Sequence, residues 1–88
     1  MFHVWFSRKA DKQHRQLDEK MQNRVADLLV TLQTTPVPTH EYDIEKISGS
    51  DTSYRVRLGQ YRVLYTIYWD EKSIEVTKID RKSDRTYK

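Results

Sequence analysis

The sequence predicts an α+β fold of the order β-α-α-β-β-β, with a mainly antiparallel, twisted sheet packed against an N-terminal helical hairpin. Three observations predict it. Strand-like alternation opens the chain at residues 2–6, helical periodicity without glycine or proline fills residues 7–33, and strand-like segments joined by turn signals occupy residues 54–81. A chain of 88 residues suffices for one small domain, so we expect a single domain over residues 1–88.

The first expected element is a strand in FHVWF, residues 2–6. Phe2, Val4 and Phe6 alternate with His3 and Trp5. This period of two places the three apolar side chains on one face of a sheet.

Two helices are expected next, because apolar residues recur at helical spacing from residue 10 to residue 32. One unbroken helix of about 26 residues would be unusual in so small a domain. The segment LDEK, residues 17–20, is the expected break. Ser7 is suited to cap the first helix and Asp18 the second. The prolines of TTPVPTH, residues 34–40, end the second helix.

Residues 41–53, EYDIEKISGSDTS, are expected to form an extended connector with Ile44 and Ile47 as its apolar anchors and SGSD as a turn. We interpret Asp43 and Glu45 as solvated carboxylates of this connector rather than as a general acid–base pair.

Three strands are expected after residue 53, and turn signals set their register. A two-residue turn at Gly59-Gln60, with glycine first, places Arg57 opposite Arg62. A second turn in WDEKS, residues 69–73, centred between residues 71 and 72, would place Arg62 opposite Arg81. The apolar side chains of the first hairpin then share the other face: Tyr54, Val56, Leu58, Val63 and Tyr65.

This register predicts a row of Arg57, Arg62 and Arg81 across three strands, with Arg55 nearby. Like charges opposed across a sheet destabilise it by up to ~1 kcal/mol per pair. An anion lying across the row would turn that repulsion into binding. The alternative is an ordinary exposed arginine face.

The charge distribution agrees with an anionic partner. The net charge is +3, and the excess lies in residues 55–88, which hold nine Lys and Arg against five Asp and Glu. A basic patch favours nucleic acid, although a merely solvated surface has the same composition. The guanidinium fork matches phosphate oxygens. The C-terminal residues Lys82, Arg85, Tyr87 and Lys88 add an aromatic ring and cations, as single-stranded nucleic acid requires.

Other chemistry finds little support in the sequence. There is no cysteine, the three histidines are scattered, and the two glycines cannot form a phosphate-binding loop. No apolar run approaches a membrane span and the N-terminus lacks the layout of a signal peptide. We therefore expect no metal or cofactor, no membrane association and a cytoplasmic location.

The block YRVRLGQYRVLY (residues 54–65), an acidic turn, a strand ending in arginine and a tyrosine near the C-terminus together resemble the RelE toxins of type II toxin–antitoxin systems. PVP followed by YDIEKISG resembles archaeal members in particular. The likeness covers nearly the whole chain. It implies a RelE-like (microbial RNase-like) fold and a ribosome-dependent endoribonuclease that cuts messenger RNA in the ribosomal A site.

The resemblance also implies roles for individual residues. It assigns transition-state stabilisation to Arg57, Arg62 and Arg81, with Arg85 as an alternative to Arg81, and stacking on or orientation of the cleaved base to Tyr87. Arg55, Lys82, Arg85 and Lys88 would bind RNA or the ribosome. Family members often carry lysines where this chain has Arg55 and Arg57, and arginine is a poor base because its pKa exceeds ~12. The general base is therefore unassigned, with Lys82 and Asp84 as weak candidates.

The implied partners are a RelB-like antitoxin, messenger RNA, the ribosomal A site with its 16S ribosomal RNA, and operator DNA bound through the antitoxin complex. An exposed sheet edge or the groove between helices and sheet would accept an antitoxin segment. Two alternatives stay open: a ParE-like toxin that inhibits DNA gyrase, and a non-catalytic nucleic-acid-binding or repressor partner of the same fold.

Overall fold

The computed structural model describes residues 1–81. Within these residues the chain forms one strand, two helices and then four further strands. The elements are β1 (His3–Phe6), α1 (Arg8–Arg15), α2 (Glu19–Thr34), β2 (Asp43–Lys46), β3 (Ser53–Leu58), β4 (Tyr61–Tyr68), the short 3₁₀ helix η1 (Trp69–Glu71) and β5 (Ser73–Arg81).

Both helices begin where the sequence predicts. The Ser7 side chain accepts a hydrogen bond from the backbone N–H of Ala10, and the Asp18 side chain accepts one from Met21. Each cap satisfies one of the backbone donors that the first turn of a helix leaves free. Residues between α1 and α2 therefore break the helical pattern at LDEK, as predicted.

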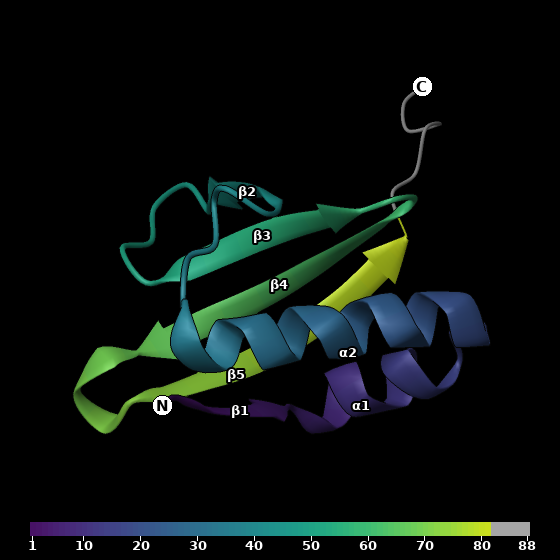
Figure 1. The fold of residues 1–88 in the computed structure, drawn as a ribbon, viewed down its shortest axis with the longest axis horizontal. Coiled ribbons are helices and arrows are strands. Elements are labelled where there is room, and N and C mark those ends of the chain that lie inside the picture. Colours follow the sequence, from purple (N-terminus) through teal and green to yellow (C-terminus); the bar gives the residue numbers. More distant parts are fainter. Residues whose placement is uncertain (82–88) are drawn as a thin grey trace.

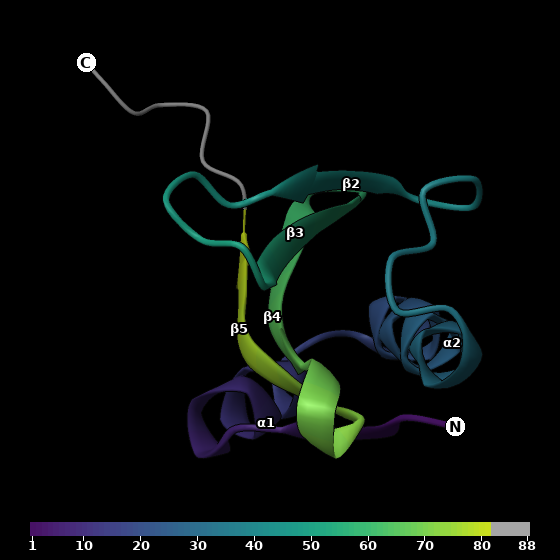
Figure 2. The same cartoon turned by 90° about the vertical axis from the view of Figure 1, so that its left-hand side faces the viewer.

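The strands form one five-stranded sheet in the order β1-β5-β4-β3-β2. All neighbouring pairs are antiparallel except β1 and β5, which run parallel. The sheet is strongly curved, and α2 lies on its concave side (Figures 1 and 2). Helix α1 continues along the edge of β5, where Gln13 accepts a hydrogen bond from the backbone N–H of Ile79 at 2.7 Å.

The hydrophobic core lies between α2 and the concave face. Val25, Leu28 and Leu32 of α2 are fully buried, as are Val63 and Tyr65 of β4. The predicted alternation in the first hairpin is confirmed, since its apolar side chains share this inner face while its arginines lie on the opposite, outer face. None of the helices within residues 1–81 is long and apolar enough to span a membrane.

The connector prediction is wrong for residues 43–46. This segment is the edge strand β2, which pairs with β3 so that Asp43 lies opposite Arg57 and Glu45 opposite Arg55. The sheet thus has one strand more than the sequence predicts. Tyr42 and Ile44 are half-buried, and they alternate with Asp43 and Glu45, which are exposed.

The register of the first hairpin is confirmed and that of the second is wrong. Arg57 lies opposite Arg62, as predicted, but Arg62 lies opposite Asp80 rather than Arg81. The second turn comes earlier than predicted, because η1 and Lys72, with its left-handed φ of 50°, complete it. A β-bulge between residues 64 and 65 of β4 then shifts the pairing with β5 by one residue.

Candidate nucleic-acid interface

The outer face of the sheet, opposite α2, carries three arginines that the hairpin β3–β4 brings together. We call Arg55, Arg57 and Arg62 the arginine cluster. Arg55 and Arg57 are two residues apart on β3 and point to the same side, and Arg62 faces Arg57 across the hairpin. The two-residue turn requires Gly59, whose φ of 60° is a conformation that side-chain-bearing residues rarely adopt.

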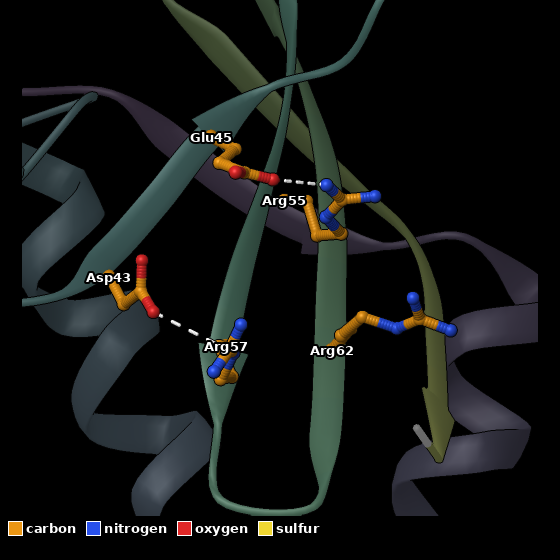
Figure 3. Close-up of a pocket in the computed structure, with 5 residues that line it drawn as sticks. All are labelled: Asp43, Glu45, Arg55, Arg57 and Arg62. Carbon is orange, nitrogen blue, oxygen red and sulfur yellow. Dashed lines mark hydrogen bonds and ion pairs between the residues drawn. The ribbon is translucent and has the colours of Figure 1, made fainter. Parts of the chain in front are cut away.

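Each arginine of the cluster has a carboxylate partner on a neighbouring strand, and Figure 3 shows the pairs of Arg55 and Arg57 with strand β2. Arg55 pairs closely with Glu45. The Nε atom of Arg57 lies 3.6 Å from Asp43 Oδ2. The Nε atom of Arg62 lies 3.4 Å from Asp80 Oδ1. One row across the sheet therefore reads Asp43, Arg57, Arg62, Asp80, and the acidic ends offset the repulsion between the two central arginines.

Arg62 and Asp80 form the least exposed of these pairs. Their side chains are 34% and 27% exposed. Asp80 also forms an ion pair with Lys78, whose Nζ lies 3.4 Å from Asp80 Oδ2. Within residues 1–81 Arg62 Nε and Asp80 Oδ1 have no hydrogen-bond partner, and their separation exceeds a normal hydrogen-bond length. Figure 3 shows the Arg62 side chain extended toward β5, away from Asp43.

A shallow pocket of ≈ 110 Å³ lies between these side chains. It is lined by Asp43, Glu45 and all three members of the arginine cluster. The pocket is thus lined by three arginines of the hairpin β3–β4 and by two carboxylates at the β2 edge. A phosphate group fits this chemistry, because guanidinium groups bind its oxygens through paired, charge-assisted hydrogen bonds.

The structure separates Arg81 from the row in which the sequence analysis places it. Arg81 lies opposite Tyr61, and its guanidinium carbon is 5.8 Å from the centre of that ring. Tyr61 packs against the core, so Arg81 belongs to the inner side of the sheet. The β-bulge is the cause, because a shift of one residue moves a side chain to the opposite face.

The other predicted site residues belong to the C-terminal segment of the chain. Lys82, Arg85, Tyr87 and Lys88 lie outside the described residues.

Two tyrosines of the described sheet have raised pKa values. Burial, with a smaller effect of Tyr54, raises the pKa of Tyr65, and a hydrogen bond to Glu75, with slight burial, raises that of Tyr68.

The carboxylates of the site were not predicted as site residues from the sequence. Asp43 and Glu45 alternate with Tyr42 and Ile44, which is the signature of a half-buried strand. That alternation is only four residues long and stands between two loops, so its pattern does not distinguish a strand from a connector. Asp80 is missed because the incorrect register puts Arg81 in its place.

The chain resembles toxins of known families over nearly its whole length. A family model described as "ParE toxin of type II toxin-antitoxin system, parDE" matches residues 4–86. The Methanocaldococcus jannaschii protein named "Putative toxin RelE1" is 36% identical over 81 residues, which cover 92% of this chain and 90% of that protein.

Solved structures give the same fold. A chain of the archaeal RelE–RelB complex from Pyrococcus horikoshii OT3 matches with a TM-score of 0.85 and 28% identity, over 96% of this chain and 98% of that one. The isolated E. coli RelE toxin matches with a TM-score of 0.83 over 98% of this chain and 89% of that one. At 18% identity, this structural match shows a shared fold alone.

Proposed function

Because this chain belongs to the RelE/ParE family of type II toxins and is a RelE-type member, we propose that it is a metal-independent endoribonuclease that cleaves messenger RNA in the ribosomal A site. The RelE-like fold expected from the sequence is confirmed. The observation that carries the proposal is the pocket on the outer face, which three arginines line together.

The proposed reaction is attack of an RNA 2′-hydroxyl on the adjacent phosphate, which leaves a 2′,3′-cyclic phosphate and a 5′-hydroxyl. Negative charge accumulates on the phosphoryl oxygens in the transition state. Arg57 and Arg62, held side by side, would stabilise that charge, and one such preorganised donor is typically worth about 10²- to 10³-fold in rate. Arg55 would bind the neighbouring phosphate. The ribosome would supply much of the substrate positioning.

The C-terminal residues enter the proposal through the resemblance. Tyr87 would stack on or orient the cleaved base, and Lys82, Arg85 and Lys88 would contact RNA or the ribosome. The geometry does not support Arg81 in this role, because Arg81 faces Tyr61 and does not lie in the row of Arg57 and Arg62. Arg85 is therefore the stronger candidate for the arginine that the family places near its tyrosine.

We also propose a RelB-like antitoxin as the partner, since the Pyrococcus protein is described in complex with RelB. Acidic residues of the antitoxin would engage the arginine cluster or displace the segment of residues 85–88. An antitoxin complex in which both remained accessible to RNA would contradict this proposal. Binding of operator DNA through the complex is part of the same proposal, and such a toxin acts in the cytoplasm.

Primer extension on messenger RNA tests the nuclease proposal. One sample contains free RNA, and the other contains purified ribosome complexes with an empty A site. Cuts confined to the A-site codon, lost in Arg57→Ala and Arg62→Ala, are expected. Arg15→Ala, which removes an exposed arginine of α1, is the charge-matched control and should cleave normally.

Gyrase inhibition is the second candidate, because the matching family model is described as a ParE toxin. A DNA supercoiling assay with purified gyrase distinguishes the two. Intact messenger RNA together with blocked supercoiling would favour the gyrase inhibitor. If the protein neither cleaves messenger RNA nor blocks supercoiling, a non-catalytic role in a repressor complex would be favoured.

A further inference from the structure

The arginine cluster can stabilise charge but cannot remove a proton from a 2′-hydroxyl. Arginine keeps its proton at any working pH. If the proposed function holds, a base is required near the pocket, and its assignment below rests on that function. The edge strand β2 places two carboxylates, Asp43 and Glu45, at the rim of the pocket.

Asp43 has the position that a general base needs. It stands in the same row as Arg57 and Arg62, directly beside Arg57 on the sheet. A phosphate bound by these two arginines would have Asp43 at its flank. The Asp43 side chain is 63% exposed, so a ribose can approach it from the open edge of the sheet. Its contact with Arg57, at 3.6 Å, is too long for a hydrogen bond.

The other carboxylates of the outer face are less suitable. Glu45 contacts Arg55 closely, and it stands one row away from the paired arginines. Asp80 is held by both Arg62 and Lys78, and its side chain is only 27% exposed. The oxygens of Asp80 therefore already have two cationic partners, which compete with a substrate hydroxyl for them. These contacts make Glu45 and Asp80 positioning residues for their arginines.

We propose that Asp43 is the general base of RNA cleavage. The Asp43 carboxylate takes the proton of the 2′-hydroxyl, and the 2′ oxygen forms a bond to phosphorus as the bond to the 5′ oxygen breaks. The departing 5′ oxygen takes a proton from water, and Asp43 releases its proton to solvent. When the phosphate binds, Arg57 turns from Asp43 to the phosphate, which leaves the carboxylate free for the ribose.

Single-turnover cleavage on ribosome complexes with an empty A site tests this assignment. Asp43→Asn should lower the rate constant about 10²- to 10⁴-fold, the usual contribution of a general base. The affinity of the variant for the ribosome complex should stay within a few-fold of wild type. It should not weaken, because the substitution removes a negative charge from a site that binds an anion. Glu41→Gln removes a carboxylate from the exposed loop just before β2 and should cleave as wild type does.

Two further readouts separate a base from a structural role. The wild-type rate should fall in acid as the carboxylate is protonated, and Asp43→Asn should lose this limb of the profile. The charged groups that line the same pocket as Asp43 are Glu45 on β2, Arg55 and Arg57 on β3, and Arg62 on β4. The second readout uses an RNA whose 5′ leaving oxygen is replaced by sulfur, which departs without a proton. With this RNA, Asp43→Asn should lower the rate constant by the same factor as with normal RNA.

Recovery of the Asp43→Asn rate with the sulfur substrate would overturn the assignment, since it would make Asp43 the acid. An unchanged rate with normal RNA would overturn it too. If Asp43→Asn does not fold, Asp43→Thr, which suits an edge strand, takes its place. No cleavage by wild-type protein would refute the proposed function as well, whereas cleavage insensitive to Asp43 would refute the base alone.

Discussion

Replacement of Tyr65 by phenylalanine should destabilise the protein by about 1–2 kcal/mol. Tyr65 is fully buried in β4, and its hydroxyl donates a 2.7 Å hydrogen bond to the carbonyl oxygen of Pro36. Such a bond contributes about 0.5–1.5 kcal/mol net, and the carbonyl left without its donor adds to the loss. Pro36 is half-buried, so water can replace part of the lost bond.

Urea unfolding followed by circular dichroism checks this value. In thermal unfolding, the Tm should fall by roughly 4–16 °C for a chain of this size. Tyr68→Phe is the matched control. Its hydroxyl donates to Glu75 on the exposed surface, so its loss should change the free energy of unfolding by less than about 0.5 kcal/mol. Equal effects of the two substitutions would refute the reasoning.

The same residue predicts a dependence on alkaline pH. Burial raises the pKa of Tyr65 in the folded state above the ordinary value of about 10 that it has in the unfolded chain. Below a pH of about 10 both states hold the proton, and stability is complete. At higher pH the unfolded state loses the proton first, so the free energy of unfolding falls as the pH rises. Tyr65→Phe should lose this component, and unfolding curves between about pH 8 and about pH 11 would measure it.

The backbone of the first hairpin, the cap of α2 and the charge of the outer face support three other predictions. Gly59→Ala should cost about 1–3 kcal/mol in thermal unfolding, because φ is 60° and an added Cβ would lie 3.1 Å from Arg24 Nη1; unchanged stability would contradict this backbone conformation. Asp18→Ala should cost about 1 kcal/mol by removing the cap of α2, and Asp18→Asn should restore most of it. Arg57→Ala and Arg62→Ala should each reduce by about one the salt slope of RNA affinity, measured by fluorescence anisotropy, if each guanidinium contacts a phosphate.

Local signals account for what could be predicted from the sequence. The caps at Ser7 and Asp18 and the turn at Gly59 depend on a few neighbouring residues, and each is confirmed. The facing of Arg57 and Arg62 follows directly from that turn. The cationic half of the candidate site was therefore predictable.

The second hairpin was not predictable in the same way. Ile74 and Val76 are two residues apart on one face, so Ile67 finds an apolar partner in either of two registers. Apolar matching alone cannot choose between them. The β-bulge at Thr77, which lies opposite the step from Leu64 to Tyr65 of β4, adds one residue to β5 and moves Arg81 to the inner side. A bulge arises from tertiary packing and has no signature in this segment.

The acidic half of the site was missed for a different reason. Strand β2 is four residues long and is bounded by loops. Its pairing with β3 decides that Asp43 and Glu45 meet arginines rather than solvent alone. This pairing is a long-range interaction that the composition of residues 41–53 does not encode by itself.

The parallel pairing of β1 with β5 constrains when the protein can fold during its synthesis. His3 lies opposite Ser73 and Phe6 opposite Val76. The first strand therefore pairs with residues that come about 70 positions later in the chain. Pairings this distant in sequence slow folding, because the chain must close a long loop first. A nascent chain that stops before β5 also lacks Ile74, Val76 and Ile79 of the core. The sheet can therefore close only after β5 has been synthesised, so the part of the chain up to β4 cannot reach the native fold by itself.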